Sequence, residues 1–427
     1  MADSVTKSET KRAIEELGRK VDSSGAWTVP QFKAFCELLE VSCQKKPQMR
    51  AMGRMAIRGE ETAESAERRL RRHSKYTCFD EPIEAFCKRE AGGLMQNWAT
   101  VAIDHTDLDH PYGTEEGSDY FPTWDGSRHL TSVGDTVTTA FLLTPGSREG
   151  FPIFTRLHET RLTPVQRAIE AMREVSALAK EHGKHVHIVM DRGMDAMEIY
   201  AEAVRLEQSV IVRVKHERDL IGDTSRPLAE SLRLRRGKCV RIRMGKKVSC
   251  NTRICVAKGF VSPLLPPVAV IGVYWDKNKH LVLNATAPGV DFDSPSALWA
   301  FVKAAVQAYF DRWGVEIFFR SFKQLFNVES ILLRDIPRRA RLLRFLLLAY
   351  IFLIHLIDKS YSYSRIVADL HANLNRLYPE LLSKKSTFIQ ALRYSFMLSL
   401  PIRPRGRPKK SENRFANELG FPNFALA

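Results

Sequence analysis

The sequence has few of the features that are typical of secreted proteins, of proteins stabilised by a structural metal ion, or of membrane-spanning proteins. Its 427 residues include seven cysteines, an odd number, and no two of them form a CxxC pair. A disulfide framework or a zinc site is therefore poorly supported, and reduced thiols are expected. The first twenty residues are polar and charged, and they lack the apolar core of a signal peptide.

Long apolar segments are also missing. The most apolar run, residues 342–357, contains Arg344 and is flanked by charged residues on both sides. It is shorter than the roughly 20 residues that a membrane-spanning helix needs. We therefore expect a buried helix there, and no membrane partner.

Acidic residues are the scarcer charge. Lys and Arg number 65 against 49 Asp and Glu, which gives a formal net charge of +16. The imbalance is concentrated in residues 231–258, which hold ten Lys or Arg and no Asp or Glu. Such an excess indicates an anionic partner rather than a particular fold. Hydrophobic residues make up 44% of the chain, enough to bury a sizeable core, so global disorder is not expected.

A second basic stretch lies near the N-terminus, in residues 66–75. It carries five Lys or Arg against one Glu. Two interpretations remain open: a solvated face of a helix, or a surface that contacts nucleic acid. Upstream of it, Val29-Pro30-Gln31 begins an amphipathic helix.

Apolar runs alternate with amphipathic helices between residues 97 and 214. Residues 98–103 predict a buried strand that ends at Asp104, and residues 185–190 predict a second strand that leads into Asp191. Other elements expected here are strands over 135–143, 151–157 and 209–214, a helix over 164–182 capped by Thr163, and a helix over 195–206. This alternation predicts a mixed α/β sheet. The stretch 215–280 interrupts it with short β-like runs and turns.

A charge that closes an apolar strand indicates a site, because it lies at the mouth of the sheet. Asp104 and Asp191 each fit that description, although a single Asp there is often only a turn or helix cap. Carboxylates are the ligands that Mg²⁺ prefers. Phosphodiester cleavage and strand transfer use two divalent ions about 3.5–4 Å apart to activate the nucleophile and stabilise the leaving oxygen.

A third carboxylate lies on a long helix that we expect from Ser294-Pro295 to about residue 327. On one continuous helix, five side chains fall within roughly an 80° arc. They are Tyr309, Arg312, Glu316, Arg320 and Lys323. A solvent-facing salt-bridge stripe would more often alternate in sign. A lone acid among bases suits a metal ligand beside phosphates.

The spacing Tyr309-x2-Arg312-x3-Glu316-x6-Lys323 resembles the Tyr-Arg-Glu-Lys signature of the insertion-sequence-four family of bacterial DDE transposases. Arg312-Trp313-Gly314-Val315-Glu316 is similar to the family's Arg-Trp-x-x-Glu core. The resemblance covers about residues 60–355.

The segments that begin at Asp104 and Asp191 resemble those around the family's first two catalytic Asp residues. They read Asp-His-Thr-Asp-Leu and Asp-Arg-Gly-Met-Asp. The order matches, and a β-rich insertion separates Asp191 from Glu316, as in the family. Asp107 and Asp195 are weaker candidates for metal ligands than Asp104 and Asp191. They could instead be hydrogen-bond acceptors that orient the ligands.

The resemblance implies a ribonuclease H-like sheet on which Asp104, Asp191 and Glu316 hold two Mg²⁺ or Mn²⁺ ions. It implies an enzyme that cleaves transposon ends and joins them to target DNA, in cut-and-paste transposition. The strand at 280–283 lacks the Trp that hairpin-forming members stack in place of a flipped base.

The resemblance implies that Tyr309, Arg312 and Lys323 hold phosphates, with Arg192 as a further contact; Arg320 is added from the basic stripe and the tail arginines from their own motif. The residues expected to contact DNA are Tyr309, Arg312, Lys323, Arg320 and Arg192, with Arg405 and Arg407 in the tail. Residues 404–410 resemble an AT-hook, in which Arg-Gly-Arg fits a narrow A·T minor groove. A generic basic tail remains the alternative.

The fold class that we expect is α/β, a ribonuclease H-like mixed sheet with a β-rich insertion subdomain and helical N- and C-terminal regions. The expected regions are a helical N-terminal DNA-binding region (1–92), the first part of the catalytic core (93–214), a basic β-rich insertion (215–280), the second part of the core with the signature helix (281–330), C-terminal helices (331–400) and a basic tail (401–427).

The expected partners are double-stranded DNA, as terminal inverted repeats and as target, and a second copy of the chain, because two ends must be joined. The resemblance implies a bacterial, cytoplasmic, nucleoid-associated protein. Two alternatives stay open: a metal-dependent nuclease on the same sheet, and a domesticated or inhibitory DNA-binding protein. The intact set of three carboxylates argues against the second.

Overall fold

The computed structural model describes most of the chain up to residue 352. The described residues are 2–43, 61–109, 121–125, 130–143, 150–158, 162–214, 228–243, 249–259, 261–276, 279–324, 326, 328–331, 333 and 335–352. The tail with Arg405 and Arg407, and the helices expected beyond residue 352, lie outside them. The chain divides into two compact units, one of residues 1–79, 319–332 and 348–427, the other of residues 80–318 and 333–347.

The first unit is helical. Its elements include α1 (Ala2–Val21), α2 (Val29–Ser42), α4 (Ala63–His73) and the short 3₁₀ turns η1 (Thr77–Phe79) and η3 (Val328–Ser330). The helix predicted from residue 29 is confirmed, and Thr28 and Gln31 form a capping box at its start. Trp27, Phe35 and Phe79 pack in its core, with Trp27 ring centroids 4.7 Å from Phe35 and 5.0 Å from Phe79.

The basic helix α4 is partly neutralised. Arg69 is mostly buried and forms ion pairs with Glu37, at 2.6 Å, and with Glu61. It therefore ties α4 to α2 instead of facing solvent. The basic side chains that remain exposed on or just after this helix are Arg68, Arg72 and Lys75.

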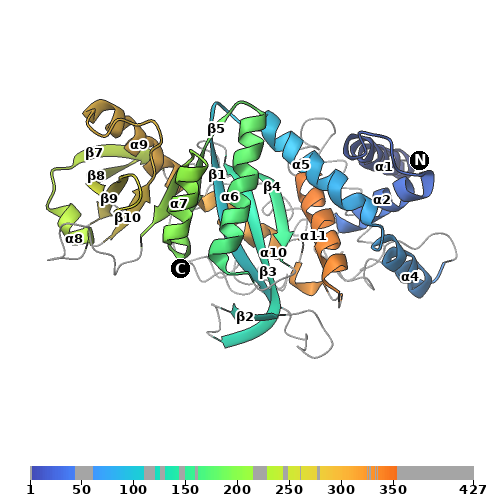
Figure 1. The fold of residues 1–427 in the computed structure, drawn as a ribbon. Helices are drawn as coiled ribbons and strands as arrows, with labels where there is room; N and C mark the ends of the chain where they lie inside the picture. Colours follow the sequence, from blue (N-terminus) through green and yellow to red (C-terminus); the bar gives the residue numbers. More distant parts are fainter. Residues whose placement is uncertain are drawn as a thin grey trace. The chain divides into compact units, whose positions relative to one another are not determined.

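The second unit is built on one mixed sheet of ten strands (Figure 1). The strand order is β2-β3-β1-β5-β6-β10-β9-β8-β7, with β4 beside β3. The strands are β1 (Trp98–Asp109), β2 (Phe121–Asp125), β3 (Leu130–Leu143), β4 (Gly150–Leu157), β5 (His185–Met190), β6 (Ser209–Arg213), β7 (Lys238–Arg243), β8 (Ser249–Gly259), β9 (Val268–Asp276) and β10 (Lys279–Ala285). Antiparallel β4, β3 and β1 are followed by parallel β5 and β6. The expected α/β class, a mixed sheet with helices packed against it, is confirmed.

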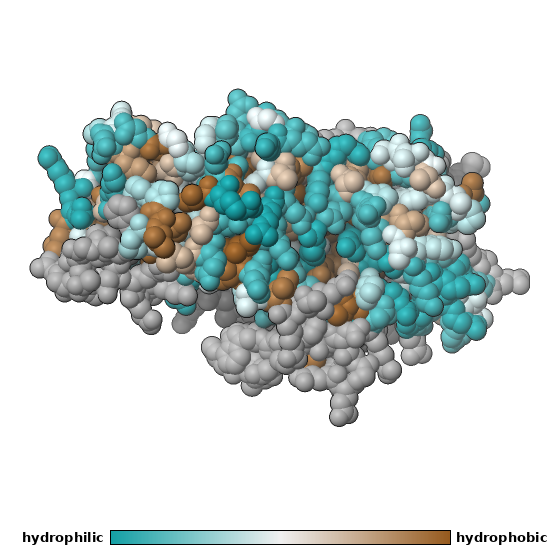
Figure 2. All heavy atoms as spheres, in the orientation of Figure 1, coloured by the Kyte–Doolittle hydropathy of each residue, from teal (hydrophilic) through white to brown (hydrophobic). Residues whose placement is uncertain are grey.

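Helices pack against this sheet. α6 (Pro164–Glu181) contacts β1, β3 and β5, and α9 (Pro295–Asp311) contacts β5, β7 and β9; the shorter α7 (Met197–Arg205) lies beside α6 (Figure 1). The predicted start of α6 is confirmed, because Thr163 and Gln166 form a capping box before Pro164. Its outward face carries largely hydrophilic side chains (Figure 2), as expected for a helix that covers a sheet on one side.

One prediction about β1 is wrong: the strand does not end at Asp104 but continues to Asp109. The parallel pairing of β1 with β5 extends only to Ala102 and Val189. The antiparallel pairing of β1 with β3 continues to Asp109 and Gly134. The apolar pattern stops at Asp104 because the strand loses its neighbour on one side there. The alternation of faces then places Asp104 and His105 on opposite sides of the sheet.

The β-rich insertion extends the same sheet. β10 pairs antiparallel with β6 at the edge of the core, and β9, β8 and β7 follow in order. α8 (Leu228–Arg233) covers one face, where Leu232 joins a small apolar cluster with Val214, Ala257, Val268, Val270 and Val282. Lys238, Arg241 and Arg243 are exposed on the edge strand β7.

α5 (Asp80–Leu94) and α11 (Ile336–Ile351) complete the elements. α11 confirms a buried helix for the part of the apolar run up to Ile351. Within the described ranges, no helix combines the length and the apolarity needed to cross a membrane. Arg339 of α11 is fully buried and donates to both carboxylate oxygens of Asp135 on β3, at 2.8 Å each, and to the Leu333 carbonyl.

We expect Arg339→Leu to lower the free energy of unfolding by about 3–5 kcal/mol, because it removes two charge-assisted hydrogen bonds from the buried Asp135 carboxylate. Urea unfolding of the full chain measures the loss. The double variant Arg339→Leu/Asp135→Leu removes both charges and should recover most of it. A single variant as stable as the wild type would contradict this anchoring role.

His187 on β5 is a buried histidine held neutral. Its ring stacks on Trp98, with centroids 4.8 Å apart, and its Nδ1 atom has no hydrogen-bond partner. Burial lowers the pKa of His187 from 6.5 to about 4. Between these values the unfolded chain binds more protons than the folded one, so stability rises with pH.

His187→Phe should therefore weaken the pH dependence of unfolding. Between pH 7 and pH 5, the neutral His187 costs the folded protein about 2 kcal/mol at 1.36 kcal/mol per pKa unit. Urea melts of wild type and variant at both pH values measure this difference. An unchanged pH dependence would show that His187 is not held neutral.

Candidate active site

Two of the three expected carboxylates meet because their strands are parallel neighbours. Ala102 on β1 pairs with Val189 on β5. Asp104 and Asp191 each lie two residues further along and so reach the same level of the sheet. Asp191 directly follows the last residue of β5, as predicted, and leads into the 3₁₀ turn η2 (Arg192–Met194).

The third carboxylate follows a break in the helix. A single helix to about residue 327 is wrong: α9 ends at Asp311, Arg312 is its C-cap, and α10 (Trp313–Gln324) begins anew. The Arg312 N–H donates to both Ala308 and Tyr309 carbonyls, and its own carbonyl accepts from Val315. The i→i−3 bonds to Tyr309 and from Val315 interrupt the α-helical ladder at Arg312, although Tyr309, Arg312 and Glu316 still lie together.

Arg312 joins the carboxylates. Its Nη1 atom donates to Oδ2 of Asp104 at 2.9 Å, and its Nη2 atom donates to Oε1 of Glu316 at 2.5 Å. The Tyr309 hydroxyl donates to Oδ1 of Asp191 at 3.4 Å, and the Arg312 guanidinium lies 5.6 Å from the Tyr309 ring centroid. The structure thus brings together five of the predicted site residues, from β1, the end of β5 and the α9–α10 junction.

Burial makes these charges interact strongly. The Arg312 side chain is 10% exposed, against 21% for Asp104 and 32% for Glu316. Burial raises the pKa of Asp104 to about 6, against the opposing pull of Arg312 and the His105 N–H. Burial alone would lower the pKa of Arg312, but attraction by Asp104, Tyr309 and Glu316 raises it above its usual value. Burial also raises the pKa of Tyr309 to about 12.

The donor set fits a hard divalent cation, because three carboxylates converge at one edge of the sheet. Across the part of the chain that the structure describes, no three His, Cys, Asp or Glu side chains are grouped closely enough to hold a metal ion as they stand. The Arg312 guanidinium contacts two of the three acids, Asp104 and Glu316.

A hydrogen-bonded network on the opposite face of β1 was missed by sequence reasoning. His105 Nε2 donates to the Pro164 carbonyl at 3.0 Å, which leaves Nδ1 to accept from the Thr138 hydroxyl at 2.7 Å. Thr138 also lies 2.6 Å from His158 Nε2. The network fixes β1 to β3 and to the start of α6 directly beside Asp104. The feature of the sequence that could have indicated this network is the position of His105 directly after Asp104.

The other predicted residues have different surroundings. Arg192 is exposed at the start of η2, and Arg320 is exposed on α10. Lys323 pairs with Glu329 at 3.0 Å within the first unit. Arg405 and Arg407 lie outside the described residues.

The two lower-ranked acids have hydrogen-bond partners of their own. Asp107 accepts from the Thr136 hydroxyl at 2.8 Å. Asp195 is almost fully buried and accepts from the Tyr200 hydroxyl at 2.9 Å. Both therefore support the strands and helix around the site.

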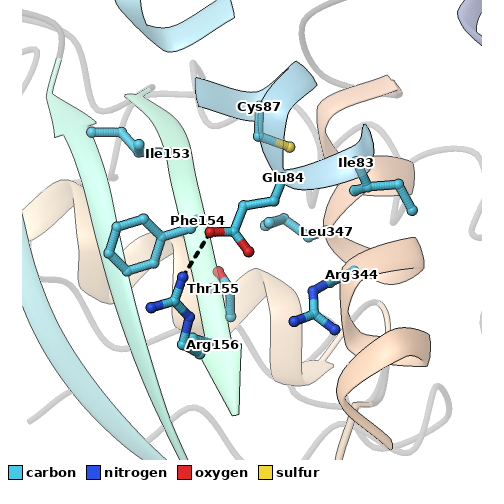
Figure 3. Close-up of a pocket in the computed structure, with 9 residues that line it drawn as sticks. All are labelled: Ile83, Glu84, Cys87, Ile153, Phe154, Thr155, Arg156, Arg344 and Leu347. Atoms are coloured by element: carbon cyan, nitrogen blue, oxygen red, sulfur yellow. Dashed lines mark hydrogen bonds and ion pairs between the residues drawn. The ribbon is translucent and has the colours of Figure 1, made fainter. Parts of the chain in front are cut away.

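A small pocket lies apart from the carboxylates, among α5, β4 and α11 (Figure 3). Its charged groups are paired: Glu84 accepts from Arg156 at 2.7 Å, and Lys88 bridges Glu84 and Glu174 at 2.9 Å each. Arg156 also pairs with Glu174. This network links α5, β4 and α6, so we assign it a structural role.

Comparisons with known proteins identify the family of the chain. The family model described as a transposase DDE domain matches residues 100–352, more than half of the chain. Among solved structures, the chain is similar to a piggyBac transposase synaptic complex with hairpin DNA determined by cryo-EM, at 12% identity and a TM-score of 0.43, covering 94% of this chain and 78% of that one. No curated protein matched. On the strength of the family match, the chain belongs to the transposase DDE domain family and is a DNA transposase.

Proposed function

We propose that Asp104, Asp191 and Glu316 are the catalytic carboxylates of this DNA transposase. The observation that carries the proposal is their convergence: three acids far apart in the sequence meet where β1, the end of β5 and the start of α10 come together. Asp104 and Glu316 share one guanidinium. Each acid stands on or directly beside a regular element, which favours a fixed geometry.

The three carboxylates would hold two divalent ions, Mg²⁺ or Mn²⁺. When bound, such ions activate the attacking oxygen and stabilise the leaving oxygen of a phosphodiester. The chain's own donors complete the site. Arg312 and Tyr309 lie at the same edge and can direct N–H and O–H groups at phosphate oxygens.

DNA contacts would extend beyond the carboxylates. Exposed Arg192 and Arg320 are proposed phosphate contacts, with Lys323 on the next turn of α10. We further propose that the N-terminal helices and the basic insertion bind the terminal inverted repeats, and that Arg405 and Arg407 bind A·T-rich DNA. Because two ends must be joined, a homodimer on DNA follows.

The finer family assignment is also a proposal. The Tyr309-Arg312-Glu316-Lys323 spacing supports an insertion-sequence-four type of transposase, which would act in the bacterial cytoplasm on nucleoid DNA. A nuclease that cuts without joining, and an inhibitory DNA-binding protein, are the competing functions. Both become outcomes of the test below.

Glu316→Gln should abolish cleavage and strand transfer while leaving DNA binding intact. Gln keeps the shape of the side chain but removes the charge that a divalent ion needs. We expect the rate to fall by at least about a hundredfold, because changing even an outer-shell partner of a ligand costs 10–100-fold. The assay uses purified protein, DNA carrying the repeats that flank the reading frame, and Mg²⁺ or EDTA.

Glu170→Gln is the matched control, since Glu170 is an exposed acid on α6. It should leave cleavage and joining unchanged. Cutting without joining by the wild type would favour the nuclease, and tight binding without cutting under any metal would favour the inhibitor. Full activity in the Glu316 variant would remove Glu316 from the site.

Arg192→Ala and Arg320→Ala should each weaken DNA binding about equally for all sequences. Each should also reduce the slope of log K against log salt concentration by about 1, because one phosphate contact releases about one counterion. Fluorescence anisotropy at several salt concentrations measures both effects. Arg173→Ala is the control, because Arg173 is exposed but paired with Glu202 at 2.8 Å. Unchanged slopes would rule out these phosphate contacts.

A further inference from the structure

The Arg312 guanidinium contacts one oxygen of each of two acids that we propose as metal ligands, Asp104 and Glu316. Arg312 binds Oδ2 of Asp104 and Oε1 of Glu316 with two different nitrogens of one guanidinium. Both distances, 2.9 Å and 2.5 Å, are those of charge-assisted hydrogen bonds. A planar group a few ångströms across therefore lies between two proposed metal ligands.

Electrostatics explains why some cation must be there. Three carboxylates gathered in a mostly buried site repel one another, and removing a partner from a buried charge is strongly destabilising. Arg312 is the positive group in contact with two of them, and Tyr309 donates to the third. The guanidinium thus supplies, in part, the charge that two divalent ions would supply.

We infer that Arg312 occupies the metal position in the DNA-free enzyme and leaves it for a DNA phosphate, so that metal binding and DNA binding are coupled. This rests on the proposed metal-binding role of Asp104 and Glu316. The two states compete, because the positive guanidinium lies against both acids and repels a metal ion that approaches the same carboxylates. A phosphate oxygen pair offers the guanidinium the bidentate partner that it loses.

The local backbone suits such a change. Arg312 lies at the junction between α9 and α10 and belongs to neither helix. Turning its long side chain needs only rotations about side-chain bonds, and no helical turn has to unwind. On α10, exposed Trp313 and Arg320 flank the carboxylate position and mark an outward side where DNA can approach.

The coupling has a thermodynamic consequence that can be measured without catalysis. DNA that releases Arg312 raises the affinity of the site for metal, and metal must raise the affinity for DNA by the same factor. Coupled sites typically change each other's affinity by about 5–150-fold. If Arg312 does not compete with the metal ion, DNA and metal should not change each other's affinity through this site.

The test is Mn²⁺ binding at pH 8, followed by the electron paramagnetic resonance signal of free Mn²⁺, with full-length protein. Without DNA, Arg312→Gln should bind Mn²⁺ about 5–150-fold more tightly than the wild type. Adding the duplex that carries the flanking repeats should tighten Mn²⁺ binding by a similar factor in the wild type, and by much less in the variant. Arg312→Lys keeps the charge but cannot bridge both acids, so its affinity should lie between the two.

Folding is monitored in the same samples by thermal unfolding with EDTA and with Mn²⁺. Mn²⁺ should raise the melting temperature of Arg312→Gln more than that of the wild type, because at a given Mn²⁺ concentration the stabilisation of the folded state grows with the logarithm of the affinity. Equal or weaker Mn²⁺ binding by both Arg312 variants would overturn the inference. If Asp104→Asn/Glu316→Gln binds Mn²⁺ as the wild type does, the proposed metal ligands fail instead.

Discussion

Mutual repulsion among Asp104, Asp191 and Glu316 is the constraint on which the site depends. The fold gathers these acids in a mostly buried place, where burial first, and then the charges of Asp191 and Glu316, raise the cost of ionising Asp104. Arg312 offsets that repulsion through two charged hydrogen bonds. Tyr309 holds the remaining acid. Each of the three acids of the candidate site is therefore hydrogen-bonded to a group of the chain itself.

The sheet supplies the rigidity that this arrangement needs. Parallel pairing of β1 with β5 sets Asp104 beside Asp191, and the pairing of β1 with β3 continues beyond the point where β5 ends. The His105–Thr138 hydrogen bond fixes that extension from the other face. The buried pair of Arg339 and Asp135 anchors α11 to β3. Substitutions at these positions would act on the site through the strands that carry it.

The sequence predicted the local elements well, because their signals are local. The capping pattern at Thr163 marked the start of α6, and the apolar run before Asp191 marked β5 with its correct end. Non-local pairing decided what was mispredicted. β1 passes Asp104 because β3 remains beside it. The sequence made no prediction of which strand the insertion joins, and in the structure β10 pairs with β6. The break at Arg312 and its contacts also depend on distant residues, which periodicity does not report.

The most direct test of the central claim is a structure of the protein with transposon-end DNA and Mn²⁺, with diffraction data collected at the manganese edge. The account predicts manganese signals among Asp104, Asp191 and Glu316, with the Arg312 guanidinium on a DNA phosphate. Manganese bound there while Arg312 still contacts Asp104 and Glu316 would contradict the coupling. Manganese bound away from the three carboxylates would contradict the site itself.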